Sequence, residues 1–196
     1  MTKKEFEIFW GLAYANTVPI SYLFKDNYSD RWFRIHSLPE SKRYAESDIE
    51  LTALLARQNR IITDLLGENS NILIVTGEYN IGERLLFTTD EEKIFSPYSF
   101  TRLTNIDLYK LNAEDYGIHE IYSPAFAKTI WASNKLNKLL TAIANYKVGA
   151  FLISVEKNVI IAPYDGGIDF ILKDTITRDF YKKKYKDWLS SREDGL

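Results

Sequence analysis

Cysteine is absent from this sequence of 196 residues, which excludes disulfides, thiol nucleophiles and metal centres ligated by cysteine. Histidine occurs only twice, at His36 and His119, and these two do not form the His-x-x-x-His spacing of zinc sites. No apolar run approaches the roughly 20 residues that a membrane helix needs. The N-terminal segment lacks a clear cleavage site for secretion. We therefore expect a cytoplasmic protein with no metal site and no membrane partner.

An excess of charge of one sign is also missing, because 25 Lys and Arg residues face 27 Asp and Glu residues, for a net charge of -2. Dedicated nucleic-acid binders usually carry a strongly basic surface. The lysines at 182–186 form a basic cluster, but Asp179 and Asp187 dilute it. We interpret it as a solvated helix face. Nucleic acid is thus a disfavoured partner, whereas a small anionic ligand is compatible with this charge.

Glycine-rich phosphate loops are missing as well. The segment Gly77–Gly82 lacks the Gly-Lys-Ser/Thr ending of a P-loop and the spacing of a dinucleotide-binding loop. No Gly-x-Ser-x-Gly nucleophile elbow is present. We predict no cofactor, and we interpret Gly77–Gly82 as a hairpin loop.

Aromatic residues are abundant, with 13 Tyr, 11 Phe and 4 Trp, and a chain of this length can bury one full core. The hydrophobic spacing predicts helices at about 3–15, 48–66, 134–143 and 176–191. It predicts strands at 32–36, 72–75, 84–88, 129–131, 148–155, 159–162 and 170–172. These elements indicate a single α/β domain of the α+β type over residues 1–196. Its mostly antiparallel mixed sheet would end in a C-terminal β-meander and pack against three to four helices.

Several local signals refine these elements. In the strand 32–36, the alternation places Phe33 and Ile35 on the core face. Ser47 and Glu50 form a capping-box pattern for the helix 48–66, and Gly67 supplies its stop. Its basic residues, including Arg57, fall opposite the apolar stripe. Ser133 or Asn134 is expected to cap the next helix.

Residues 90–124 carry no clear period. They combine Pro97, several aromatic residues, a short alternation at 106–109 and a turn at 117–119. This region could form a variable insertion or lid, a pair of edge strands, or both.

The segment Pro163–Asp169 places two carboxylates beside a glycine pair. Asp-Gly and Gly-Gly pairs supply the backbone freedom of tight connections, so we favour a turn between strands. In the alternative, Gly166 and Gly167 allow a ligand to approach the backbone, and Asp165 and Asp169 act as metal or proton-transfer groups, although the segment lacks the alternating ligands and distal glutamate of an EF-hand loop.

A second polar cluster spans residues 34–44. His36 could act as a general base if a reacting group came within hydrogen-bond reach. Arginine and lysine side chains could bind phosphate or carboxylate. We favour a polar loop after a strand, yet this cluster is the best candidate for an anion-recognising surface. Its candidate ligand-binding residues are Arg34, Ser37, Lys42 and Arg43.

Two segments, WFRIHSLPESKRY at 32–44 and PYDGGID at 163–169 followed by YKDWL at 185–189, carry a resemblance. They are similar to a group of uncharacterised bacterial proteins that is classed only as a domain of unknown function. The resemblance implies a bacterial cytoplasmic protein with no established activity. It carries over no catalytic residue.

Three functions fit these observations. The first is a non-enzymatic binding protein of the inhibitor or immunity type, with a protein partner held by aromatic and arginine anchors. The second is an enzyme for a small phosphorylated or carboxylated substrate, with His36 as base and Asp165 or Asp169 orienting it. The third is a purely structural subunit, which a mutual Arg34–Asp169 pair would favour. We prefer the binding protein.

Overall fold

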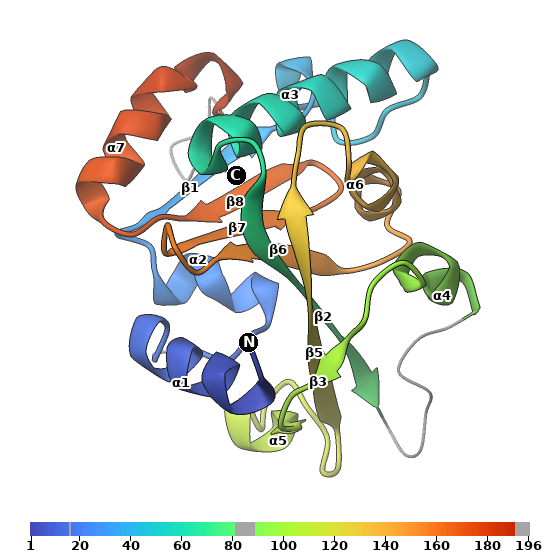
Figure 1. Ribbon diagram of the computed structural model, residues 1–196, viewed down its shortest axis with the longest axis vertical. Coiled ribbons are helices and arrows are strands. Elements are labelled where there is room, and N and C mark those ends of the chain that lie inside the picture. Colours follow the sequence, from blue (N-terminus) through green and yellow to red (C-terminus); the bar gives the residue numbers. More distant parts are fainter. Residues whose placement is uncertain (16, 81–88, 191–196) are drawn as a thin grey trace.

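A single open sheet runs through the molecule (Figure 1). The computed structural model describes residues 1–15, 17–80 and 89–190. Within these residues the strands follow the order β1-β8-β7-β6-β2-β5-β3, and β4 also pairs with β5. The strands are β1 (Trp32–His36), β2 (Ser70–Asn80), β3 (Thr101–Arg102), β4 (Ile106–Asp107), β5 (Ile121–Trp131), β6 (Ala150–Ser154), β7 (Val159–Pro163) and β8 (Gly167–Ile171).

Every strand pair in the described part of the chain is antiparallel. Strands β6, β7 and β8 form the C-terminal meander, and β1 closes that end of the sheet by pairing with β8. The predicted α+β class, with its antiparallel sheet and meander, is therefore confirmed.

Helices cover both faces of the sheet (Figure 1). One face packs with α3 and α6, and the other packs with α1 and α2. The helices and helical turns are α1 (Lys3–Ala13), η1 (Ser21–Leu23), α2 (Phe24–Asn27), η2 (Pro39–Ser41), α3 (Asp48–Leu66), α4 (Thr89–Phe95), α5 (Leu108–Leu111), α6 (Asn137–Ala144), α7 (Thr175–Lys184) and η3 (Lys186–Trp188).

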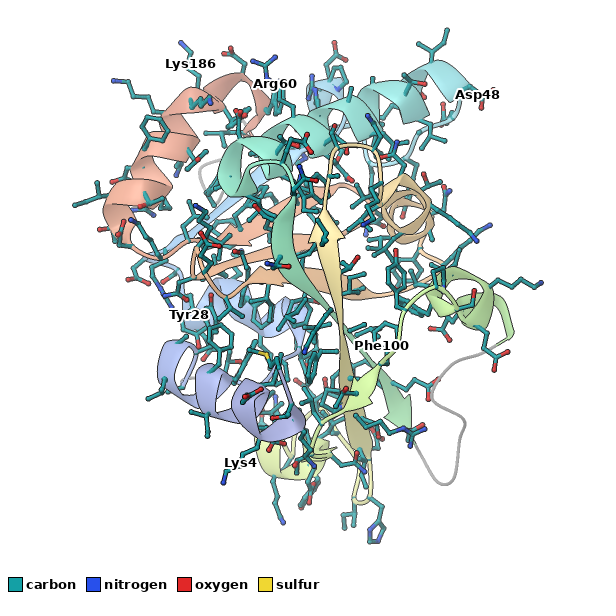
Figure 2. The ribbon with its side chains drawn as sticks, viewed as in Figure 1. Lys4, Tyr28, Asp48, Arg60, Phe100 and Lys186 are labelled. Carbon is teal, nitrogen blue, oxygen red and sulfur yellow. The ribbon has the colours of Figure 1, made fainter. Side chains whose placement is uncertain are left out.

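This double cover explains why the central strands are continuous apolar runs. In β6, Leu152 belongs to the α3 and α6 core, whereas Phe151 and Ile153 belong to the α1 and α2 core. The second core is rich in aromatic side chains, and Tyr28 contacts Tyr14 there (Figure 2). Strands buried on both faces lose the polar alternation of a half-exposed sheet.

The alternation in β1 is as expected, because Phe33 and Ile35 are buried in the α3 and α6 core. Ser47 is the N-cap of α3, and its Oγ accepts a hydrogen bond from the Glu50 amide at 3.3 Å. The reciprocal half of the capping box does not form, because the Glu50 carboxylate accepts from the Glu46 amide and pairs with Lys42.

The predicted cap of α6 is wrong. This helix begins at Asn137 after Leu136, which makes no side-chain capping bond. Asn134 instead adopts a positive φ of 67°, and its amide donates to Asn59 Oδ1 at 2.6 Å. Residues 133–136 therefore form a turn, although the predicted apolar stripe at Leu139, with its neighbours in the helix, is buried.

The hairpin-loop interpretation of Gly77–Gly82 is also wrong over its described residues, because 77–80 belong to β2. Gly77 pairs with Pro124 of β5. A Cβ atom at Gly77 would lie 2.5 Å from the Tyr122 ring, so only glycine fits there without displacing a side chain. The strand predicted at 84–88 lies outside the described residues.

Between β2 and β5, the described residues form α4, β3, β4 and α5, and the two short strands both pair with β5 at the edge of the sheet. At the other end of the chain, α7 stops at Lys184 and a separate turn, η3, follows, so the predicted helix 176–191 is shorter. Asp64 of α3 holds this end, through Lys184 at 2.6 Å and the Tyr185 hydroxyl.

Candidate functional site

The two polar segments of the sequence meet at the β1–β8 edge of the sheet. Arg34 of β1 lies directly opposite Asp169 of β8, and His36 lies opposite Gly167. The turn between β7 and β8 is tied to the chain after β1, because the Ser37 amide donates to the Gly166 carbonyl at 3.1 Å. Residues 135 positions apart in sequence thus share one edge of the sheet.

Arg34 and Asp169 form a bidentate ion pair. Arg34 donates from Nε and Nη2 to the two carboxylate oxygens of Asp169, at 2.6 and 2.7 Å. Both side chains are largely buried, with 17% and 16% exposed. The guanidinium lies 5.6 Å from the ring centre of Trp32 and 4.6 Å from that of Tyr164. Burial raises the pKa of Tyr164 to about 12, so this ring stays neutral.

Asp165 is also held by the 34–44 segment, through one arginine nitrogen and one tyrosine hydroxyl. Its carboxylate is only 3% exposed, and its Oδ2 accepts from Arg43 Nε at 2.8 Å and from the Tyr44 hydroxyl at 2.9 Å. The hydrogen bond to Asp165 raises the pKa of both Arg43 and Tyr44. Both predicted carboxylates are therefore matched by an arginine from the 34–44 segment.

The glycine pair serves close packing. A Cβ atom at Gly167 would lie 2.0 Å from the Ile35 carbonyl oxygen, and one at Gly166 would lie 2.8 Å from the Tyr164 ring. Backbone approach of this kind requires glycine. For Gly167 the close neighbour is β1, and for Gly166 it is the Tyr164 side chain of the same turn.

The remaining candidate ligand-binding residues are engaged as well. Ser37 is fully buried and its Oγ accepts from Gln58 Nε2 at 2.9 Å. Lys42 donates to Glu46 at 3.0 Å and to Glu50 at 2.7 Å. The cluster that the sequence indicated as an anion site is largely satisfied by its own chain.

His36 lines a cavity that neither of the two aspartates lines. It lines a cavity of about 340 Å³ together with the loop after β1, Arg57 of α3 and η3. Neither Asp165 nor Asp169 lines this cavity. Burial, and then the charges of Arg34 and Arg57, lower the pKa of His36. The structure thus brings Arg34 to Asp169 and Arg43 to Asp165, and leaves His36 on a different cavity.

The cavity contains residues that sequence reasoning missed. Arg57, expected opposite the apolar stripe, is half-buried; it donates from Nη1 to the His36 carbonyl at 3.3 Å and lies 5.2 Å from the Trp188 ring centre. A signal was available, because Arg57 follows Leu54 by three positions and precedes Ile61 by four, and both of these are buried. Such spacing places a residue at the border of the buried stripe.

The described residues contain neither a cluster of metal ligands nor a membrane-spanning helix. No group of three or more His, Asp or Glu side chains in the described residues is placed to share a metal ion. Among the described helices, none combines the length and apolar character needed to cross a bilayer.

The fold and the site define an α+β domain in which an edge strand and the turn of a β-meander are joined by two arginine–aspartate pairs. The chain belongs to a family described as a domain of unknown function (DUF3885), whose model matches residues 20–193. The family class implied by the resemblance is thereby confirmed. No curated protein and no solved structure matches the chain.

Proposed function

We propose that this chain is a non-enzymatic binding protein, of the inhibitor or immunity type, that recognises a protein partner. The observation that carries the proposal is the state of the two carboxylates. Asp165 and Asp169 are each bound by an arginine of the same chain, and His36 lines a cavity without them. A general base must reach its reacting group, and its orienting partner must reach the base. The enzyme alternative therefore loses support. The Arg34–Asp169 pair is equally what the structural-subunit alternative expects, so the choice between that alternative and a binding protein rests on the exposed surface described next. The bacterial and cytoplasmic setting stays a prediction.

The binding surface would be the exposed side of the Asp165 site. We define the Arg43 patch as Arg43, Tyr44 and Tyr146. Arg43 is 63% exposed, Tyr44 is 50% exposed and Tyr146 is 84% exposed. Tyr146 lies close enough to Tyr44 to contribute to the raised pKa of that hydroxyl. Arginine and tyrosine are the residues that most often anchor protein interfaces.

The patch is held in place before any partner arrives. Asp165 fixes Arg43 through Nε and fixes Tyr44 through its hydroxyl. Ala45 and Ala144, which neighbour the patch in sequence, pack into a small apolar cluster. Side chains that are already ordered lose less conformational entropy on binding.

Charge indicates the chemistry of the partner. Arg43 binds Asp165 through Nε alone. Its two terminal nitrogens make no hydrogen bond to any described residue. They remain available to a carboxylate, which guanidinium groups bind well. We therefore propose a protein partner that presents an acidic side chain flanked by apolar surface for the two tyrosine rings.

The test is affinity capture with purified variants as bait, followed by reconstitution with the purified partner. The double variant Arg43→Ala/Tyr44→Ala removes the patch. A matched control, Tyr109→Ala/Lys110→Ala, removes an exposed tyrosine and a neighbouring cation from α5. We expect a partner that binds the wild type and the control, and binds the patch variant at least about tenfold more weakly.

A second variant separates loss of the patch from loss of folding, because Arg43→Ala/Tyr44→Ala leaves a buried carboxylate without partners. Tyr146→Asn does not touch Asp165, and asparagine tolerates the positive φ of 57° at that position. It should weaken the same complex while leaving thermal unfolding unchanged. A partner that binds all four proteins equally, or no partner for any of them, would contradict the proposal.

A further inference from the structure

The cavity beside His36 is lined by charges that make no ion pair with any other described residue. Its walls come from the loop after β1, from α3 and from η3, and its volume is about 340 Å³. This size falls within the range of small-molecule sites. Apolar walls are supplied by Leu38, Pro39, Trp188 and Leu189.

Among the described residues, one cation lines this cavity. Arg57 makes no ion pair with any carboxylate of the described residues; it rests on the His36 carbonyl and the Trp188 ring. Burial lowers its pKa, which is the effect of desolvating a charge without a counter-ion. His36 also has a lowered pKa, because burial and the nearby arginines favour its neutral form.

Two carboxylates, Glu40 and Asp187, line the same cavity. Within the described residues neither of them makes an ion pair. Glu40 also has a positive φ of 56°, as does its neighbour Ser41. Such backbone conformations are strained and cluster at functional sites. A simple dianion such as phosphate would meet Arg57 but would be repelled by these two groups.

We propose that this cavity binds a small zwitterion of the free α-amino acid class. Arg57 takes the carboxylate, Glu40 and Asp187 take the ammonium group, and the Trp188 and Leu189 walls contact the side chain. An α-amino acid carries one charge of each sign, and side chains of both signs line the cavity. The proposal replaces the small anion suggested by the sequence, and it stands independently of the protein partner proposed above.

Isothermal titration of the full chain with each of the twenty L-amino acids tests the proposal. For each amino acid that binds, the probes are its N-acetyl derivative, which lacks the ammonium charge, and its amide, which lacks the carboxylate. We expect saturable 1:1 binding of at least one amino acid, with a dissociation constant below about 1 mM. Each derivative should bind at least about tenfold more weakly, and inorganic phosphate should not bind.

Three variants assign the contacts. Arg57→Gln should bind the parent amino acid and its amide equally, and Glu40→Gln/Asp187→Asn should bind the parent and its N-acetyl derivative equally. The double variant should fold, because both of its residues are exposed and neither makes an ion pair with another described residue. The control is Lys186→Gln. Lys186 (labelled in Figure 2) is exposed and precedes Asp187 in the sequence, but it does not line the cavity. It should keep the wild-type affinity.

Two results would overturn the proposal. One is the absence of saturable binding for all twenty amino acids. The other is binding in which the parent and both derivatives have the same affinity, or in which the double variant still rejects the N-acetyl derivative as the wild type does.

Discussion

Removal of the Arg34–Asp169 pair should destabilise the fold strongly if this pair joins β1 to β8. Asp169 is 16% exposed and Arg34 is 17% exposed in the intact pair, and each single substitution removes the bidentate partner of the other side chain. Removing one partner of a buried pair costs about 3–5 kcal/mol. Because about a sixth of each side chain still meets solvent, we expect the lower end, about 3 kcal/mol, for Asp169→Ala. Arg34→Ala should cost about 1 kcal/mol more, since it also removes the stacking on Trp32 and Tyr164.

Urea denaturation of the two single variants and the double variant measures this as a double-mutant cycle. The double variant leaves no charge unpaired, so its cost should fall below the sum of the single costs by about 1.5–3 kcal/mol. Lys110→Ala, which breaks an exposed pair with Asp107, should leave stability almost unchanged. Additive single costs, or a loss below about 1 kcal/mol for both single variants, would refute the structural role of the pair.

Two further predictions concern the same edge of the sheet. Gly167→Ala should lower the free energy of unfolding by more than about 3 kcal/mol in urea denaturation, because its Cβ would lie 2.0 Å from the Ile35 carbonyl oxygen. Gly149→Ala, with no atom within 4 Å of its Cβ, should lower it far less or raise it slightly. Equal effects of the two substitutions would contradict the assigned packing. The pKa of His36 is lower in the folded state than its unfolded value of about 6.5. The stability that neutral His36 contributes to the fold is therefore present above about pH 6.5 and is lost as the pH falls through the folded pKa. Urea midpoints between pH 7 and 5 should therefore fall less steeply for His36→Gln than for the wild type. Identical slopes for the two proteins would contradict the burial of His36.

Much of the fold could be predicted because it depends on local periodicity. The alternation in β1 identified Phe33 and Ile35 as core residues, and Ser47 and Gly67 marked the ends of α3. The errors lie where tertiary contacts override local signals. Asn59 holds the turn before α6, and that contact has a sequence separation of 75 residues.

The site was harder to predict because it depends on which strands are neighbours. The sequence named Arg34, Arg43, Asp165 and Asp169. The pairing of β1 with β8 brings Arg34 to Asp169, and the loop after β1 brings Arg43 to Asp165. The same residues could equally have faced a ligand. Arg57 was missed for a different reason: its helical spacing places it only at the border of the buried stripe, and the residues that enclose it come from the loop after β1 and from η3.

Recognition of a protein partner by the Arg43 patch can be observed inside cells. Site-specific photo-crosslinking tests it most directly, with benzoylphenylalanine in place of Tyr146 in the cells that naturally contain the chain, and with the same substitution at Tyr109 as the control. We predict one discrete crosslinked adduct from position 146 and none of that mass from position 109. The absence of an adduct at position 146, or the same adduct from both positions, would contradict the claim.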